Sequence, residues 1–355
     1  MKTRILIVDD SLIFRKALEE SLSVEPDIEV IGSVRNGLKA VEFIRSKRPD
    51  LVTLDVEMPD MDGLETLAAI QAVNRETPDL PPMGVVMVSA HTRKGADITI
   101  QALEAGAFDF IAKPQTASLE ESRQILRRQL LVKIRYFAGK RFSYARPPHP
   151  APATAPGTPP PPGAGAAAAV VIGVSTGGPK ALATLAPALC NALRIPIFIV
   201  QHMPAGFTRS LAASLDRKCA YAVVEAAHRQ PVEDRHVYIA PGDRHLLIRP
   251  GENGATTVIN RQPPESGSRP SADVLFRSAA TVFGSRLVAL ILTGMGSDGT
   301  KGAAAIKRAG GRVIAQDEAT SVVWGMPGSA AAAGHVDAVL PLDRIADAVV
   351  RLVNG

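Results

Sequence analysis

Ser175 stands in a glycine-rich turn, Gly173-Val174-Ser175-Thr176-Gly177, directly after the apolar run 170–172. A G-x-S-x-G pattern predicts a nucleophilic serine where a strand precedes it and a helix follows. The apolar run predicts the strand, and Gly178-Pro179 opens a helical pattern, because proline suits the first helical turn. Ser175 is therefore a candidate nucleophile for acyl transfer. A phosphate-binding helix N-terminus is the alternative that this turn leaves open.

A serine hydroxyl is a weak nucleophile near neutral pH and needs a base, which in turn needs an acid to orient it. His202 follows the predicted strand 196–200, and Asp298 follows the predicted strand 287–293. Because the carboxyl ends of parallel strands meet at one sheet edge, we expect both side chains near Ser175. The chain order Ser, His, Asp differs from that of α/β-hydrolases, so the pattern predicts a Ser-His-Asp triad on another fold.

Other residues compete for these roles. His245 also follows a predicted strand and has an acid nearby, which makes it the main rival base. Asp317 is a weaker substitute acid, and Asp298 could be only a turn residue before a glycine. The backbone N–H groups of Thr176 and Met295 are candidates for an oxyanion hole, because both belong to turns at strand ends.

A second group of polar side chains lies in the first half of the chain, each at the end of a predicted strand. These residues are Asp9, Asp10, Asp55, Ser89 and Lys113. Three neighbouring carboxylates repel one another unless a hard cation such as Mg²⁺ binds them. The pattern predicts that Asp55 accepts a phosphoryl group, while Lys113 and Ser89 contact the transferred oxygens.

Taken singly, these residues have ordinary structural roles. Asp9 or Asp10 could cap the helix predicted from Ser11, and Lys113 could be a solvated charge before a proline. Their joint occurrence in this order favours the phosphate-accepting site. Phe110, in the last predicted strand of this half, would report phosphorylation through a change of rotamer.

The elements that position these residues alternate along the chain. With 355 residues the chain exceeds one ordinary hydrophobic core, so we expect two domains. In residues 1–137, β-branched runs alternate with amphipathic helical patterns, which predicts a flavodoxin-like, CheY-like doubly wound sheet of five parallel strands. The predicted strands are 5–8, 29–34, 51–54, 85–88 and 109–112, and the last helix is 119–137.

The second half repeats this alternation after a change in composition. Residues 138–169 are rich in proline, alanine and glycine, which predicts an extended linker. Residues 170–355 predict a mostly parallel, Rossmann-like α/β domain with a short strand pair at 246–248 and 256–259. The other predicted strands of this domain are 170–174, 196–200, 236–240 and 287–293.

The composition indicates a protein of the cell interior. The chain has 40 Lys and Arg against 35 Asp and Glu, and this formal charge of +5 permits an anionic partner without indicating nucleic acid. Its two cysteines form no CxxC pair, and no apolar stretch reaches the length of a membrane span. We therefore expect a cytoplasmic location without membrane insertion. The basic run near Arg127 to Arg141 is typical of a solvated helix face.

The first domain resembles the response-regulator receiver family over essentially its whole length, through the segments VDDS, LDVEMPDMDG, VSA and AKP. The resemblance implies that a histidine kinase donates the phosphoryl group. It also implies a Mg²⁺ site formed by Asp9, Asp10, Asp55 and the backbone carbonyl of Glu57.

The second domain resembles the chemotaxis-receptor methylesterase and glutamine deamidase family, the CheB type, over nearly all of residues 170–355. Six segments carry the resemblance: GVSTGGP, IVQHMP, YIAPGDRHL, DVLFRSAA, LTGMGSDG and IAQDEATSVVWGMP. The resemblance implies Ser175 as nucleophile, His202 as general base and then acid, and Asp298 as the orienting carboxylate. It places Thr176 and Met295 in the oxyanion hole and implies no cofactor at this site.

Together the two resemblances imply a phosphorylation-activated hydrolase. It would release methanol from glutamate methyl esters, and ammonia from glutamine side chains, on the cytoplasmic helices of chemoreceptors, giving sensory adaptation in chemotaxis or a related pathway. They also imply that the unphosphorylated receiver covers the esterase opening. A non-catalytic phosphorelay adaptor is the rival reading. A DNA-binding response regulator is disfavoured, because the second half has no evident helix-turn-helix pattern.

Overall fold

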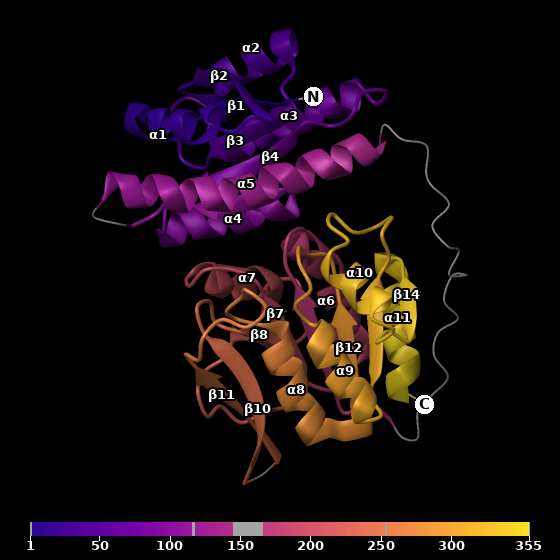
Figure 1. The fold of residues 1–355 in the computed structure, drawn as a ribbon. Helices are drawn as coiled ribbons and strands as arrows, with labels where there is room; N and C mark the ends of the chain where they lie inside the picture. The colour runs from indigo at the N-terminus through magenta and orange to yellow at the C-terminus, as the bar shows by residue number, and fades with distance from the viewer. Residues whose placement is uncertain (1, 116–117, 145–165, 253, 355) are drawn as a thin grey trace. The chain divides into compact units, whose positions relative to one another are not determined.

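The computed structural model describes residues 2–115, 118–144, 166–252 and 254–354. The chain forms two compact units, Met1–Pro152 and Ala153–Gly355. Figure 1 draws the first unit in indigo to magenta, and the second continues through orange to yellow. Each unit is an α/β fold built on its own parallel sheet, as the sequence predicts.

The first unit contains a five-stranded sheet in the order β2-β1-β3-β4-β5, in which every neighbouring pair is parallel. This order is that of a flavodoxin-like sheet and confirms the predicted fold class. The strands are β1 (Thr3–Val8), β2 (Ile28–Val34), β3 (Leu51–Asp55), β4 (Gly84–Ser89) and β5 (Asp109–Ala112). The helices are α1 (Leu12–Ser23), α2 (Gly37–Lys47), α3 (Gly63–Glu76), α4 (Arg93–Glu104) and α5 (Leu119–Tyr144).

Helix α5 continues to Tyr144, beyond the end predicted at residue 137. The prediction ended the helix before Gly139, but one glycine costs a helix only about 1 kcal/mol relative to alanine. Side-chain pairing holds the preceding turns in place, because Arg127 and Arg135 both bind the buried carboxylate of Glu25. The helix is thus longer than the apolar pattern alone indicates.

The second unit contains a seven-stranded sheet in the order β14-β13-β12-β6-β7-β9-β8, and all its recorded pairs are parallel. Its strands are β6 (Ala169–Val174), β7 (Ile197–Gln201), β8 (Ala222–Glu225), β9 (His236–Ile239), β12 (Leu287–Ile291), β13 (Arg312–Gln316) and β14 (Ala338–Leu340). The strands β10 (His245–Gly251) and β11 (Gly254–Asn260) form the predicted strand pair as an antiparallel hairpin.

The described residues of the second unit also form the α-helices α6 (Gly178–Ala192), α7 (Phe207–Asp216), α8 (Ala272–Phe283), α9 (Thr300–Arg308), α10 (Met326–Ala332) and α11 (Leu342–Asn354). The sheet is lined by fully buried aliphatic residues such as Val171, Ile199 and Leu290. Strands β8, β13 and β14 were not predicted. Each is only three to five residues long, which is too short to separate an apolar run from a buried helix turn.

The last residues of the predicted linker 138–169 form hydrogen bonds with the second unit. Ala168 donates its N–H to the carbonyl of Arg286 at 2.7 Å, and Ala167 donates to Leu352 at 3.4 Å. The predicted linker residues 145–165 lie outside the described residues. Within the described part of the chain, no helix combines the length and apolar character that a membrane span requires.

Candidate active site

Ser175 lies at the carboxyl end of β6, in the turn that leads into α6. Its N–H donates to the Thr293 carbonyl at 2.9 Å, and its own carbonyl accepts from Gly178 at 2.8 Å and from the Gln201 side chain at 3.0 Å. Gly177 has a φ of +80°, the left-handed region that glycine adopts without strain. The backbone of Ser175 is therefore fixed from both neighbouring strands.

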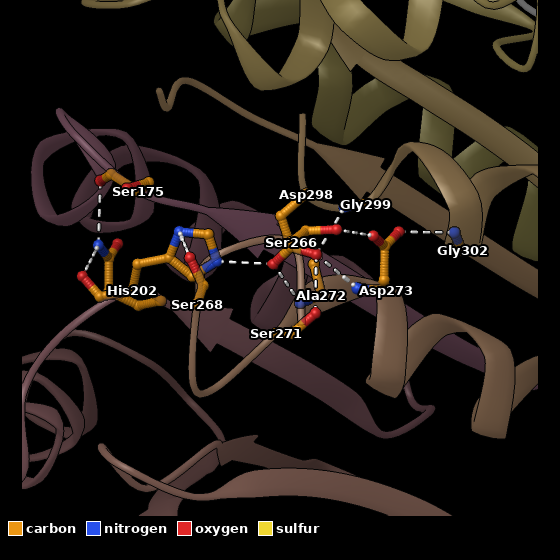
Figure 2. Close-up of polar contacts among 11 residues, drawn as sticks. Ser175, His202, Ser266, Ser268, Ser271, Ala272, Asp273, Asp298, Gly299 and Gly302 are labelled. Carbon is orange, nitrogen blue, oxygen red and sulfur yellow. Dashed lines mark hydrogen bonds and ion pairs between the residues drawn. The ribbon is translucent and has the colours of Figure 1, made fainter. Parts of the chain in front are cut away.

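His202 follows β7 and is joined to the sheet edge through its backbone, which donates to the Val174 carbonyl at 3.1 Å. Its ring Nε2 lies 2.7 Å from Oδ2 of Asp298, which comes from the turn between β12 and α9. Figure 2 shows the imidazole directed at this carboxylate, with the Ser175 turn on the opposite side of the ring in this view. The structure thus brings two of the three predicted triad residues into direct contact.

Asp298 is almost completely buried and has a full set of donors besides His202. The N–H groups of Ala272 and Asp273, in the first turn of α8, donate to it at 2.7 and 2.9 Å. The Ser271 hydroxyl donates at 2.8 Å and the Gly299 N–H at 2.9 Å. Although burial opposes ionisation, the hydrogen bond from His202 and these donors lower the pKa of Asp298. The carboxylate is held charged and in one orientation.

The hydrogen bond between Nε2 and Asp298 determines which ring nitrogen of His202 is able to accept a proton. With Nε2–H donated to Asp298, Nδ1 carries the free lone pair. The Ser268 hydroxyl lies 3.5 Å from Nδ1, a long contact, and within the described residues no hydrogen bond joins the Ser175 hydroxyl to the ring. Catalytic hydrogen bonds are often long in the absence of substrate. Ser175 and His202 are thus placed on adjacent strand ends without a direct bond.

The turns that contain Thr176 and Met295 are tied together through Thr293. The Thr293 hydroxyl donates to the Thr176 carbonyl at 2.9 Å, and it accepts from the Val323 N–H at 2.9 Å. Gly294 pairs with the segment at Trp324 as an isolated parallel bridge. Both predicted oxyanion-hole residues therefore belong to fixed backbone at the same sheet edge as Ser175.

The structure gives the rival residues other roles. His245 begins β10, is fully buried, and has its Nε2 3.1 Å from the Pro263 carbonyl. Asp317 accepts from both the N–H and the hydroxyl of Thr320, which is a local turn. Neither residue is among the hydrogen-bond partners recorded for His202.

Several residues at this site were missed by the sequence reasoning. Ser271 and Ser268 contact Asp298 and His202, and Asp273 lies buried beside Asp298. The only available signal was the position of Ser271 before a helical pattern, which indicates a cap and not a contact to a distant carboxylate. Gln201, which holds the Ser175 carbonyl, gave no signal beyond its place at a strand end.

The predicted phosphate-accepting cluster forms at the carboxyl edge of the first sheet. Carboxylate oxygens of Asp9, Asp10 and Asp55 lie within 4.8 Å of one another. Lys113 places its Nζ 2.9 Å from Oδ2 of both Asp9 and Asp55. Three hard oxygen donors at this spacing fit a small divalent cation such as Mg²⁺.

The excess of negative charge in this cluster shifts the pKa values of Asp55 and Lys113. Burial, and then the Asp9 carboxylate, raise the pKa of Asp55 to about 6, although Lys113 lowers it. Burial disfavours the charge on Lys113, but Asp55 and Asp9 more than offset it and raise the pKa of the ammonium. The site therefore favours any further cation.

The other predicted receiver residues lie near this edge. Ser89, at the end of β4, is fully buried and donates to the Ala90 carbonyl at 3.2 Å. Phe110 is buried in β5. The Glu57 carboxylate pairs with Lys94 at 3.4 Å, and the role of its backbone carbonyl stays a prediction.

Comparisons with known proteins agree with this division of the chain. Residues 170–349 match the family model described as CheB methylesterase, and residues 5–124 match the response regulator receiver domain. A relative from Nocardioides, named protein-glutamate methylesterase/protein-glutamine glutaminase, is 45% identical over 98% of this chain and 94% of its own length. A Geobacillus kaustophilus protein of the same name is 44% identical over the whole of both chains.

A solved structure supports the fold of the second unit. The catalytic domain of Thermotoga maritima CheB methylesterase is 43% identical and superposes with a TM-score of 0.52, covering 53% of this chain and all of that domain. A receiver model matches the first unit, a methylesterase model matches the second, and relatives 44 to 45% identical align over nearly the whole chain. The chain belongs to the CheB methylesterase family, with a response regulator receiver domain at its N-terminus.

Proposed function

We propose that this chain is a phosphorylation-regulated protein-glutamate methylesterase and protein-glutamine glutaminase that acts on chemoreceptors. The observation that carries the chemistry is the contact between His202 Nε2 and Asp298 at the strand end beside Ser175. The names of its relatives support the substrate class. The catalytic set is Ser175, His202 and Asp298, with the N–H groups of Thr176 and Met295 as oxyanion donors.

In the proposed reaction, the Ser175 hydroxyl turns toward Nδ1 of His202 and transfers its proton there while Oγ attacks the side-chain carbonyl carbon of the substrate. The C–O bond to methoxide, or the C–N bond to the amide nitrogen, then breaks as the imidazolium returns the proton to the leaving group. Methanol or ammonia departs and leaves an acyl group on Ser175. Water, deprotonated by the same nitrogen, then attacks the acyl carbon. The bond to Ser175 Oγ breaks, Oγ takes the proton back from the imidazolium, and a free glutamate carboxylate is released.

The surroundings of Asp298 would favour proton transfer to His202 in this reaction. A buried, charged carboxylate stabilises the imidazolium that forms in both halves of the reaction. Its five hydrogen bonds keep it from rotating away from the ring. The hydrogen bond on Nε2 also fixes the tautomer in which Nδ1 is the base.

The receiver chemistry is assigned to the acidic cluster of the first unit. Asp55 is the proposed phosphoryl acceptor, and Asp9, Asp10, Asp55 and the Glu57 carbonyl would hold Mg²⁺. When bound, this cation neutralises charge on the transferred oxygens. Lys113 and Ser89 would bind phosphoryl oxygens, and Phe110 would respond by changing its rotamer.

The proposed partners follow from these two chemistries. The substrate side chains would lie on the cytoplasmic helices of a methyl-accepting chemoreceptor, and a histidine kinase would donate the phosphoryl group. The protein would therefore work in the cytoplasm. We propose no cofactor for the esterase site, because a hydroxyl, an imidazole and a carboxylate suffice for acyl transfer.

The deciding experiment measures methanol release from methylated chemoreceptor by the full chain. Ser175→Ala should abolish release above background, whereas Ser285→Ala, at an exposed serine of the 3-10 turn Gly284–Arg286, should leave it unchanged. A small-molecule phosphodonor should increase release by wild type and have no effect on Asp55→Ala. If Ser175→Ala releases methanol at the wild-type rate, the assignment of Ser175 as nucleophile fails. If wild type releases no methanol, the esterase assignment fails and the adaptor reading replaces it.

A further inference from the structure

Helices α8 and α9 both begin without a side-chain cap of their own. The N-cap residue of α8 is Ser271, whose side chain makes no capping hydrogen bond with its own helix. The N-cap residue of α9 is Gly299, which has no side chain to cap its helix. The first N–H groups of a helix need acceptors, and here these acceptors come from elsewhere in the chain.

Each helix receives its cap from the start of the other helix. Asp298 directly precedes Gly299 and accepts from the N–H groups of Ala272 and Asp273 in the first turn of α8. Asp273 in turn accepts from the N–H of Gly302, in the first turn of α9, at 2.7 Å. Figure 2 shows this exchange, with Asp273 between Asp298 and Gly302. The acid of the proposed triad is one half of a reciprocal capping pair.

Asp273 also binds the loop beside the imidazole. Its Oδ2 accepts from the Ser266 hydroxyl at 2.8 Å. Ser266 has a φ of +50°, an unfavourable conformation for a residue other than glycine, so this bond helps hold a strained turn. Two residues later, Ser268 places its hydroxyl 3.5 Å from His202 Nδ1. Asp273 thus connects the segment that carries Asp298 with the loop that faces His202.

The burial of Asp273 indicates that its hydrogen-bond acceptors are needed at this position. The side chain is fully buried, and burial, together with the neighbouring Asp298, raises its pKa. The facing charges are Asp298 and, along the same helix, Arg277. An apolar residue would fill this space without the desolvation cost of a carboxylate. The two hydrogen bonds to Gly302 and Ser266 are what an apolar residue could not supply.

We propose that Asp273 is a positioning residue of the esterase site, which fixes Asp298 and the loop 266–268 around His202 by reciprocal helix capping. This inference rests on the proposed function and extends it. Asp273 touches no reacting atom and acts through Asp298. A catalytic group displaced by about 1 Å can cost about 100-fold in rate, so loss of the cap should reduce turnover more than substrate binding.

The test compares three variants of the full chain in methanol release. Asp273→Ala should lower kcat at least about tenfold with KM within about twofold, whereas Asp273→Asn, which keeps an acceptor for the Gly302 N–H, should stay within about threefold of wild type. Ser278→Ala is the matched control, because this buried α8 hydroxyl is bonded to Leu275 and Ile248 instead. Its kcat should equal that of wild type. A kcat for Asp273→Ala within about twofold of wild type, or an equal loss in Ser278→Ala, overturns the proposal.

A second readout separates this proposal from the esterase assignment. The proton between His202 Nε2 and Asp298 should give a low-field NMR resonance in wild type and Asp273→Asn, and it should be lost or shifted in Asp273→Ala. This signal does not depend on turnover, so an inactive wild type would refute the esterase function alone. If Asp273→Ala does not fold, Asp273→Asn decides: a loss of kcat beyond about tenfold with a displaced acid limb of the pH profile would assign the effect to charge and overturn the capping role.

Discussion

His202 Nε2 lies 2.7 Å from Asp298 Oδ2, and this contact gives the two ring nitrogens different roles. The nitrogen that donates to the carboxylate cannot accept a proton from the nucleophile. In the proposed reaction the base is then Nδ1, which faces the loop containing Ser268. The proposed mechanism therefore requires the Ser175 hydroxyl and Nδ1 to meet, while the Asp298 contact stays in place.

Asp298→Asn should lower kcat by about 1,000-fold or more with little change in KM. The amide can present its NH₂ group to Nε2, which favours the tautomer with the proton on Nδ1 and removes the base. Methanol release under saturating receptor measures the effect. Asp317→Asn is the control, because the Asp317 carboxylate accepts from the N–H and the hydroxyl of Thr320 in a local turn, and it should retain wild-type kcat. Equal losses in both variants would contradict the assignment of the acid.

The raised pKa of Asp55 predicts a specific pH dependence of receiver stability. The folded pKa is about 6 against an ordinary value of 3.8, so the folded state binds the proton more tightly than the unfolded state. The resulting stability is fully present below about pH 4 and is lost as pH rises toward and through 6, at a total cost on the order of 3 kcal/mol.

Hydrogen exchange of peptides covering β3 and β4 in the full chain, without Mg²⁺, should detect this change. Asp55→Asn has no proton to lose, so its stability relative to wild type should increase between pH 4 and 7. Added Mg²⁺ should reduce the difference, because the cation favours the ionised carboxylates. A difference between the two proteins that is independent of pH would refute the raised pKa.

Removal of the divalent cation should prevent phosphorylation of Asp55. With a small-molecule phosphodonor, mass spectrometry should detect the phosphorylated chain in Mg²⁺ and none after chelation by EDTA. Asp9→Asn and Asp10→Asn should each raise the Mg²⁺ concentration needed for half-maximal phosphorylation by about tenfold or more, since each removes one carboxylate from the cluster. Asp97→Asn, an exposed acid on α4, should behave as wild type. Phosphorylation that persists in EDTA would exclude the proposed role of the cluster.

The sequence predicted the class of both folds because buried parallel strands have continuous apolar runs that turn residues end. Ser175, His202 and Asp298 were identifiable as candidates because each follows such a run. The environment of Asp298 was not predictable. Ser271 and Asp273 contact Asp298 because the start of α8 packs against the turn before α9. These two segments are about 25 residues apart in the sequence, so their contact leaves no local pattern.

The last prediction concerns the space around Ser175, the proposed nucleophile. A Cβ atom at Gly294 would lie 2.7 Å from the Ser175 Cβ and 2.5 Å from the Met326 sulfur. Contacts this short force a shift, and the Ser175 turn lies against the added methyl group. Gly294→Ala should therefore lower kcat by about 100-fold, as expected for a nucleophile displaced by about 1 Å.

Gly334→Ala separates this displacement from a general loss of stability. Gly334 has a φ of +73° and open space around its Cα, so alanine there strains the backbone without touching the site. We expect it to lower the free energy of unfolding by about 1 kcal/mol while kcat stays at the wild-type value. Titration of reactive Ser175 with a fluorophosphonate, followed by methanol release per titrated site, makes the comparison quantitative. If Gly294→Ala keeps full turnover per site, the nucleophile tolerates the methyl group, and close packing at Gly294 does not set the position of Ser175.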